Sequence, residues 1–358
     1  MTSYEFKMKT LRQDMSEIPS DTTILTFERK FNQTIRVGDL PLSLKKLVLS
    51  IEFDSEIEIG AIPDGLEEID FGSWYHQPIA PGLLPKSLRI LKLSDEFQNV
   101  LEIGSIPDGV EEIDFGIDYN HPIVPGLLPK SLKKLVLSEG FGNALEIGSI
   151  PCGVEEIEFG SDYNHPIVPG LLPKSLKKLV LSYFFEKKLE LGSIPDGLEE
   201  IDFGVYYNHP IIPGLLPKSL KKLSLPRKLN NRLENGSIPD GVKEIDFGGI
   251  YNHPIVPGLL PKSLEILRLS NLFDKQIARE SIPNGLREIH FGEEYTGIIY
   301  HIPKSTKIFS KTHIPGISYT YVNCGNNLDI IKSEIGDGYE FGDIYDYRDY
   351  KAVDVKRI

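Results

Sequence analysis

The sequence predicts a mostly β, right-handed solenoid in which each 22-residue unit adds one short strand to a long parallel sheet. Three observations lead to this prediction. The dipeptide Ile-Pro or Leu-Pro begins thirteen times from Ile18 to Ile282, and every step between starts is 22 residues. Each unit repeats the same apolar positions, and prolines and glycines interrupt the remainder. A fixed period of this size indicates stacked repeats, which bury their apolar faces against one another.

The strand of each unit is expected near its middle. Apolar residues stand three, six and eight places after the proline, as in Val110, Ile113 and Phe115. This spacing is the L-x-x-L-x-L pattern of leucine-rich units. The segment Ile113-Asp114-Phe115 alternates apolar and polar residues, as a strand with one buried face does.

Successive units are of two kinds, so the deeper period is 44 residues. One kind begins Ile106-Pro-Asp-Gly and the other begins Leu128-Pro-Lys-Ser. Both kinds carry an aromatic column and an aliphatic column that are expected to fill the core, such as Tyr119 with Phe141 and Ile123 with Leu145. Few helices are expected, because prolines and glycines between residues 122 and 129 leave no room for more than a helical turn.

Three regions are predicted along the chain. Residues 1–17 are expected to be an N-terminal lead and cap, and residues 18–301 hold the thirteen units. Residues 302–358 are expected to be a C-terminal cap with an acidic, tyrosine-rich end, because the apolar columns stop after Ile302. Unpaired strand edges at both ends of a solenoid need such covers.

Composition disfavours several classes of partner and compartment. The chain has 52 acidic and 39 basic residues and a net charge of −13, which disfavours nucleic acid and anionic membranes as partners. Two cysteines, Cys152 and Cys324, and polar first residues favour an intracellular, cytoplasmic location over secretion. No apolar run approaches the ~18 residues of a membrane span.

The candidate interaction surface is the open face of the predicted sheet, where outward strand residues are free to vary. Its residues are mainly charged and recur with the repeat. They are Glu68, Asp70, Lys92, Glu112, Asp114, Lys134, Glu156, Glu158, Lys178, Glu200, Asp202, Lys222, Glu244, Asp246 and Arg268.

These carboxylates invite two interpretations. Paired carboxylates serve acid–base or glycosidase catalysis, but a catalytic site is normally singular and this pair recurs every 44 residues. Flanking units place Lys134 and Lys178 on either side of Glu156, so we favour a charge ladder that fixes which unit lies beside which.

Other polar columns give no catalytic, cofactor or metal site. The histidines at 121, 165, 209 and 253 recur in every second coil, ~10 Å apart, too far to share one zinc ion. We expect them in turns, where asparagines such as Asn120 satisfy backbone groups. Ser131 and its equivalents have no unique His and Asp partners. Trp74 stands in a loop column and is a candidate contact residue if it is exposed.

The repeat resembles a known family. The segments 31–35, 119–123 and 163–167, which read Phe-Asn-Gln-Thr-Ile and Tyr-Asn-His-Pro-Ile, are similar to the FNIP repeat. This family is a leucine-rich-repeat-like array of social amoebae and giant viruses of amoebae, so a host-cytoplasmic location is implied if the chain is viral. The signature has decayed in the Lys-Ser-Leu units, for example at 97–101. Some relatives carry an F-box, and here the seventeen residues before the first unit are too few for one.

The sequence therefore predicts a non-enzymatic scaffold that binds a protein partner through the open sheet face. Because the strand positions vary little from unit to unit, a self-associating structural protein is the first alternative. The resemblance implies a second alternative, the substrate-recognition part of a ubiquitin-ligase assembly whose F-box lies on another chain.

Overall fold

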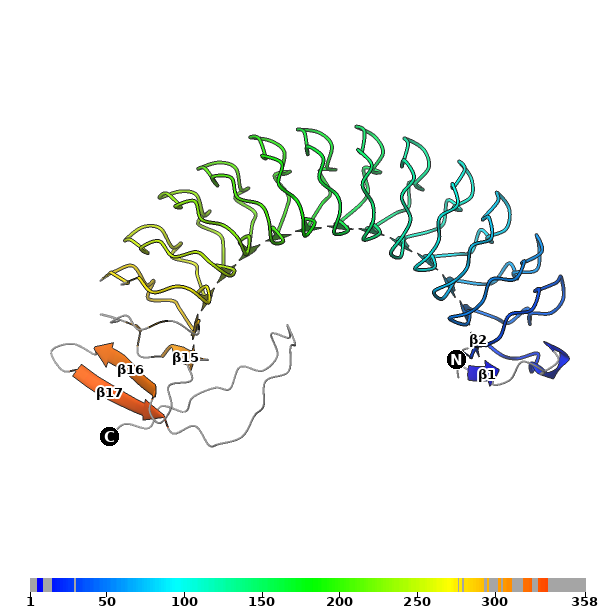
Figure 1. Ribbon diagram of the computed structural model, residues 1–358, viewed down its shortest axis with the longest axis horizontal. Coiled ribbons are helices and arrows are strands. Elements are labelled where there is room, and N and C mark those ends of the chain that lie inside the picture. The colour runs from blue at the N-terminus through cyan, green and yellow to red at the C-terminus, as the bar shows by residue number, and fades with distance from the viewer. Residues whose placement is uncertain are drawn as a thin grey trace. The chain divides into compact units, whose positions relative to one another are not determined.

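The protein is described by a computed structural model over residues 5–8, 15–28, 30–275, 277–278, 280–292, 295, 302–303, 305–310, 318–323 and 328–333. The chain forms two compact units, residues 1–195 and residues 196–358. Each unit is a stack of coils, and within each unit the strands lie side by side along one edge of the stack (Figure 1).

Unit 1 contains a parallel sheet whose strands pair in chain order. One 3-10 turn, η1 (Met15–Glu17), precedes its first repeat. The strands are β1 (Glu5–Met8), β2 (Ile24–Phe27), β3 (Lys46–Val48), β4 (Glu68–Asp70), β5 (Ile90–Lys92), β6 (Glu112–Asp114), β7 (Lys134–Val136), β8 (Glu156–Glu158) and β9 (Lys178–Val180).

Unit 2 repeats this design and ends in a separate antiparallel pair. The parallel strands are β10 (Glu200–Asp202), β11 (Lys222–Ser224), β12 (Glu244–Asp246), β13 (Ile266–Arg268), β14 (Glu288–Phe291) and β15 (Lys307–Ser310). The antiparallel strands are β16 (Ser318–Asn323) and β17 (Leu328–Ser333), which the sequence did not predict. The predicted mostly β, leucine-rich-repeat-like solenoid is confirmed.

Strands β3 to β13 are three residues long, and in each of them the middle side chain faces the core. In β6, Ile113 is buried, whereas Glu112 is exposed and Asp114 is partly exposed. The strand begins one residue earlier than predicted, at Glu112, although Phe115 also points inward and its amide bonds to the Val136 carbonyl. The predicted alternation of inward and outward side chains is therefore confirmed.

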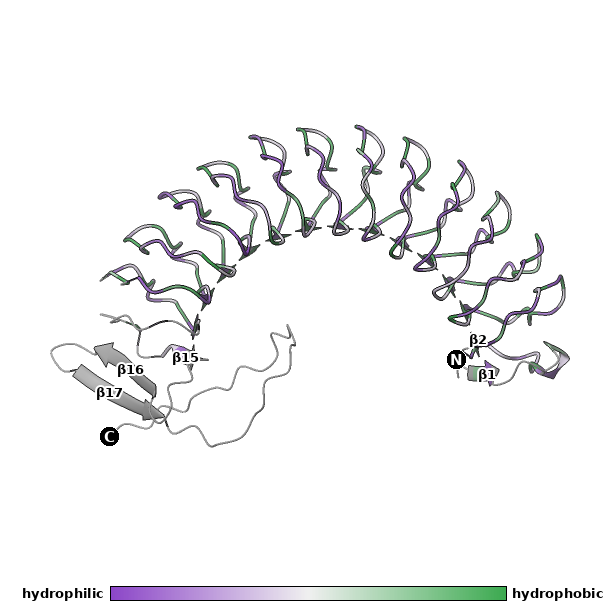
Figure 2. Cartoon of the chain, in the orientation of Figure 1, coloured by the Kyte–Doolittle hydropathy of each residue, from purple (hydrophilic) through white to green (hydrophobic). Residues whose placement is uncertain are grey.

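The core consists of columns of like side chains, one from each coil. In unit 1 the rings of Phe31, Phe53 and Tyr75 stack in sequence, with centroids 6.0 Å and 5.8 Å apart. All three are buried, and each contributes roughly 1.5–3 kcal/mol through removal of its apolar surface from water. Green and purple alternate around every coil, which shows how hydrophobic and hydrophilic residues alternate along the chain (Figure 2).

The 44-residue period has a steric cause at the position two residues after the strand. In the coil of β5 this position is the buried Ser94, whose hydroxyl donates to the Tyr75 carbonyl over 2.6 Å. The next coil has Gly116 there, with a φ of 71°, and a Cβ at Gly116 would overlap the Ser94 carbonyl oxygen. A coil that carries serine must therefore be followed by one that carries glycine.

The stack extends past the thirteen units at both ends. At the start of unit 1, β1 lies in the segment expected to be a lead and cap, and it pairs with β2 of the first repeat. In unit 2, β15 pairs with β14 although the columns were expected to stop after Ile302. Ile302 and Thr306 remain buried, so the stacked core continues into β15. The tyrosine-rich end, residues 339–347, lies outside the described residues.

Candidate functional site

The strand residues proposed as an interaction face occupy the first and third positions of their strands. The structure brings Glu112, Lys134, Glu156 and Lys178 of unit 1 into one row. In unit 2 it aligns Glu200, Lys222 and Glu244. Ion pairs form within these rows between Lys46 and Glu68, 2.7 Å apart, and between Lys222 and Glu244, 3.8 Å apart. The predicted register of alternating charges is thus present within each unit.

A second charged row, one residue before each strand, was missed from the sequence. Lys45 pairs with Glu67 at 2.8 Å, and Lys133 pairs with Glu155 at 3.4 Å. Its signal was available, because these residues recur with the same 22-residue spacing. The side chains are about half exposed, so each pair contributes only about 0–1 kcal/mol and the row mainly selects the register.

Several aspartates of the predicted face hold the turn that follows the strand. Asp70 and Asp114 accept the amides of Gly72 and Gly116 through Oδ1, at 2.9 Å and 3.0 Å. In unit 2, Asp202 and Asp246 bond their glycines in the same way, at 2.8 Å. Burial raises the pKa of both Asp202 and Asp246, and the glycine amide opposes that shift. These carboxylates thus have a structural role.

Glu158 of β8 departs from this pattern. It stands where other strands have aspartate, and its side chain is exposed. The following Gly160 lacks the positive φ of Gly72 and Gly116. The carboxylate of Glu158 is therefore available on the surface of a coil whose turn differs from its neighbours.

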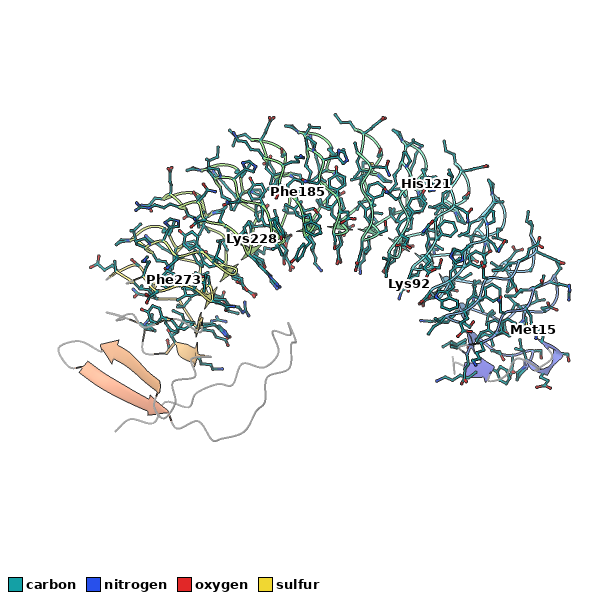
Figure 3. All side chains as sticks on the ribbon, viewed as in Figure 1. Met15, Lys92, His121, Phe185, Lys228 and Phe273 are labelled. Carbon is teal, nitrogen blue, oxygen red and sulfur yellow. The ribbon has the colours of Figure 1, made fainter. Side chains whose placement is uncertain are left out.

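A groove of about 540 Å³ runs along the carboxyl ends of strands β4 to β8 in unit 1. Its charged lining residues are Asp70, Lys92, Asp95, Asp114, Glu139 and Glu158. Lys92 points away from the stack at the strand edge (Figure 3). Five carboxylates against one ammonium group make the groove acidic, so it attracts positively charged groups.

Exposed aromatic residues occupy the turns next to the first and last residues that line this groove. Trp74 follows the lining residue Ser73 and is 46% exposed, so it meets the condition set for a contact residue. In the other of these turns the Phe184 amide bonds the carbonyl of lining residue Ser161 over 3.1 Å. The Tyr183 and Phe184 rings are about half exposed and meet edge to face, with centroids 4.8 Å apart.

The turn residues along this edge vary from coil to coil, unlike the strand positions. In unit 1 the successive pairs are Ser73-Trp74, Asp95-Glu96, Ile117-Asp118, Glu139-Gly140, Ser161-Asp162 and Tyr183-Phe184. A surface that recognises an irregular partner needs this kind of variation.

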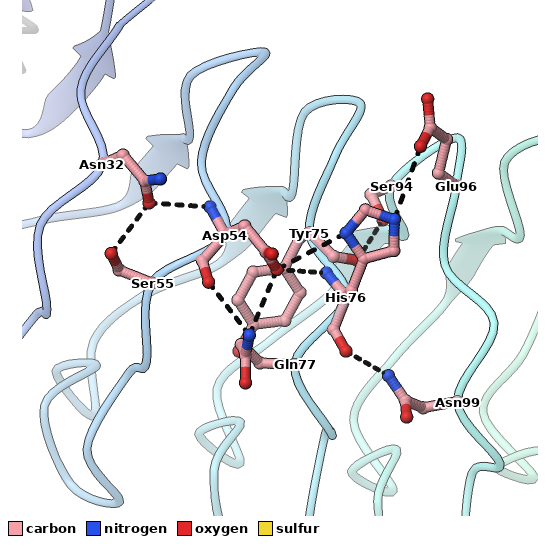
Figure 4. A network of polar contacts seen from close by, with 9 residues as sticks. All are labelled: Asn32, Asp54, Ser55, Tyr75, His76, Gln77, Ser94, Glu96 and Asn99. Atoms are coloured by element: carbon pink, nitrogen blue, oxygen red, sulfur yellow. Dashed lines mark hydrogen bonds and ion pairs between the residues drawn. The ribbon is translucent and has the colours of Figure 1, made fainter.

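The asparagine and histidine columns connect coils, as their turn positions suggested. Asn32 Oδ1 accepts the Asp54 amide over 2.9 Å, and Asp54 Oδ1 accepts the His76 amide over 2.8 Å (Figure 4). His121 Nε2 bonds the Gln98 carbonyl over 2.7 Å, while its ring meets Tyr119 edge on. These groups stabilise the stack, so they are poor candidates for chemistry.

The candidate serine is likewise engaged with the backbone. The Ser131 hydroxyl contacts the Asp108 carbonyl and donates to the Val110 carbonyl over 2.6 Å. Across the described ranges, no cluster of three or more His, Cys, Asp or Glu side chains is arranged to hold a metal ion. Nor does the part of the chain that the structure describes include a helix long and apolar enough to cross a membrane.

Comparison with known proteins agrees with the two-coil period. Six consecutive segments match the family described as "FNIP Repeat": residues 31–73, 75–118, 119–162, 163–206, 207–250 and 251–294. A solved structure described as "The crystal structure of CroV588 a novel circular LRR protein structure" is similar over 81% of this chain, with a TM-score of 0.76 and 28% identity. This chain spans 43% of that solved chain. No curated protein matches the sequence. Because the six segments cover most of its length, the chain belongs to the FNIP repeat family.

Proposed function

We propose that this chain is a non-enzymatic scaffold that holds a basic segment of a protein partner in the groove along β4 to β8. The observation that carries the proposal is the acidic groove, with exposed Trp74 in the turn beside lining residue Ser73 and exposed Tyr183 and Phe184 in the turn beside lining residue Ser161. Aromatic side chains anchor protein interfaces, and a row of carboxylates selects lysine and arginine.

The proposal refines the interaction surface expected from sequence. Asp70, Lys92, Asp114 and Glu158 line the groove and belong to the predicted face. Among these, Glu158 is the most suitable for contact, because Asp70 and Asp114 are bonded to the glycines of their own turns. The binding edge thus combines strand residues with the turn residues that follow them.

The test is affinity capture with the full chain, followed by mass spectrometry. A Glu139→Lys/Glu158→Lys variant reverses two groove charges at exposed positions, where no turn depends on them. The matched control, Glu234→Lys/Asp240→Lys, makes the same change in net charge at exposed positions of unit 2.

We expect the groove variant to lose the specific partner, with affinity reduced by about 10-fold or more, and the control to retain it. Retention of every captured protein by the groove variant would contradict the proposal. A stoichiometric bound metal ion, or turnover in a hydrolase screen, would contradict its non-enzymatic part.

A further inference from the structure

Three carboxylates of the groove in unit 1 have no partner of their own. Asp95, Glu139 and Glu158 line the groove, and among the described residues their side chains form no ion pair and no hydrogen bond. By contrast, Asp70 and Asp114 are bonded to the glycines of their own turns. A positively charged ligand in the groove therefore finds its unengaged partners at Asp95, Glu139 and Glu158.

Asp95 and Glu139 occupy the same turn position in two coils that have one coil between them. Backbone hydrogen bonds connect the three coils here. The Ile117 amide donates to the Asp95 carbonyl over 3.1 Å, and the Gly140 amide donates to the Ile117 carbonyl over 2.8 Å. Ile117 is 43% exposed and lies between the two acids. Because neighbouring strands are ~4.8 Å apart, the two acids are ~10 Å apart along the groove.

The groove admits an extended chain and is too narrow for a helix. From β4 to β8 it crosses four strand spacings, which is a length of ~19 Å. Its volume of about 540 Å³ divided by that length gives a mean cross-section of roughly 30 Å². An α-helix with its side chains is about 10–12 Å across, so its cross-section is roughly 80 Å² or more. A helix would rest on the rim of the groove, whereas an extended chain enters it.

Two extended conformations present side chains at different spacings. A β-strand directs every second side chain to one face, at intervals of ~6.6–6.8 Å, so its like-facing side chains are ~7 or ~13 Å apart. A polyproline II helix has three residues per turn and a rise of ~3.1 Å, so side chains three residues apart point the same way and are ~9.3 Å apart. Only the second spacing matches the ~10 Å between Asp95 and Glu139.

From this match, and resting on the binding site proposed above, we infer that the groove selects a polyproline II segment with lysine or arginine at two positions three residues apart. One cation binds Asp95 and the other binds Glu139, and the residues between them pack on Ile117. Glu158, one coil beyond Glu139, adds negative charge at that end. Proline is favoured between the cations, because it holds the chain in this conformation before binding and so lowers the cost of ordering it.

The turn position of Asp95 and Glu139 also fixes where along unit 1 such a segment binds. The coils on either side of these two have Ser73 and Ser161 at this position. Unit 1 therefore offers one pair of acids two coils apart at this position, in contrast to the charged strand rows, which repeat along the sheet. A ligand with two cations binds in a single register and does not slide along the stack.

The first test compares three fluorescent peptides of identical composition for binding to the full chain, by fluorescence anisotropy. Each carries two lysines in a proline-rich host, and the lysines are two, three or four residues apart. We expect the peptide with lysines three residues apart to bind about 10-fold more tightly than the other two.

Two results would overturn the inference and still leave the proposed function standing. One is equal binding of the three peptides, with Glu139→Lys/Glu158→Lys weakening all of them. The other is no binding of any peptide by a chain whose captured partner is still lost in that groove variant. Retention of the captured partner would instead remove the proposed function, and the inference with it.

The second test exchanges charges at one contact. Glu139→Lys should weaken the preferred peptide by about 10-fold, and a peptide with one of its two lysines changed to glutamate should regain binding to this variant. The matched control is Asp162→Lys, the same change of charge at an exposed acid one coil further along that does not line the groove. It should change the affinity by less than about 3-fold. Equal weakening by the two variants would mean that the peptide responds only to net charge, which contradicts the inference.

Discussion

At Gly116 a single hydrogen atom in place of a side chain decides how two coils meet. The backbone there is left-handed, and the carbonyl oxygen of Ser94 occupies the space of a Cβ. Gly126 also has a positive φ, 92°, but an added Cβ there meets nothing within 4 Å. The two glycines separate the effect of backbone strain from the effect of packing.

We predict that Gly126→Ala lowers the free energy of unfolding by about 1–3 kcal/mol, through backbone strain alone. Gly116→Ala should lower it by about 2 kcal/mol more, because the methyl group also displaces the Ser94 backbone. Urea unfolding followed by circular dichroism measures both variants. If the two substitutions lower the free energy of unfolding equally, the Ser94 backbone moves aside at no energetic cost and the prediction is wrong.

The buried tyrosines make the stack sensitive to alkali. Tyr119 and Tyr163 are fully buried, and burial raises the pKa of each phenol to about 12. Neither hydroxyl meets the geometry of a hydrogen bond, although each approaches a leucine amide, Leu101 and Leu145 respectively. In an unfolded chain tyrosine ionises near pH 10, so above that pH the unfolded state releases protons first.

Stability should therefore be insensitive to these tyrosines below pH 10 and should fall as the pH rises from about 10 to 12. The variant Tyr119→Phe/Tyr163→Phe should show a shallower decline. The measurement is the urea midpoint at intervals across this range. At neutral pH the variant should be at least as stable as the parent, because it buries two fewer unpaired hydroxyls.

At the scale of one strand and its turn, aspartate determines the turn geometry. Asp114 accepts the Gly116 amide and Gly116 takes the left-handed conformation, whereas Glu158 is followed by a glycine without it. A carboxylate one methylene longer is displaced from the amide two residues on, so the turn after β8 forms differently.

We predict that Asp114→Ala lowers the free energy of unfolding by about 1–2 kcal/mol, because a partly buried amide loses its acceptor. Glu158→Ala should change it by less than about 0.5 kcal/mol, as expected of an exposed side chain. Thermal unfolding of the two variants provides the comparison. A larger loss at Glu158 would mean that its carboxylate holds the turn by another contact.

The elements were predictable from sequence because the pattern that defines them is local and repeated. Ile113 and Phe115 mark the inward side of a strand, and the aromatic column follows from the 22-residue period alone. The strand register followed too, because Lys134 can satisfy both Glu112 and Glu156 only when the coils align.

The groove was not predictable, although four of its residues were on the predicted face. Its shape depends on which residue follows each strand in the turn, such as Ser73, Ile117 or Ser161, and the period of the repeat does not fix that residue. The Gly116 and Ser94 contact was also missed, because it joins residues of two coils that are 22 positions apart and neither looks unusual alone. Likewise the antiparallel β16 and β17 lie beyond the repeat, where no column predicts pairing.

At the scale of the whole molecule, the two-coil period limits how the array changes length. Removing residues 84–127 takes out 44 residues and still places the serine of one coil beside the glycine of another. Removing residues 106–127 takes out 22 and places Ser138 beside Ser94, at the position where a Cβ on Gly116 would overlap the Ser94 carbonyl. It also brings Arg89 beside Lys133.

We predict that the 44-residue deletion unfolds at a higher temperature than the 22-residue deletion, although it loses twice as much core. In a stack with nearest-neighbour contacts, a mismatched interface weakens both coils that share it. Differential scanning calorimetry gives the order of the two midpoints. The reverse order would mean that the number of coils matters more than their alternation.

The strands of unit 1 pair only with their immediate neighbours, and this determines how the unit responds to a pulling force. Each of these strands contacts only the strand before it and the strand after it. Tension applied along the stack is therefore carried in series, and the weakest coil yields first. Each 22-residue coil that peels away releases about 75 Å of slack chain. Pulled from its ends, unit 1 should lengthen in even increments, as a molecular spring does when its turns open one at a time.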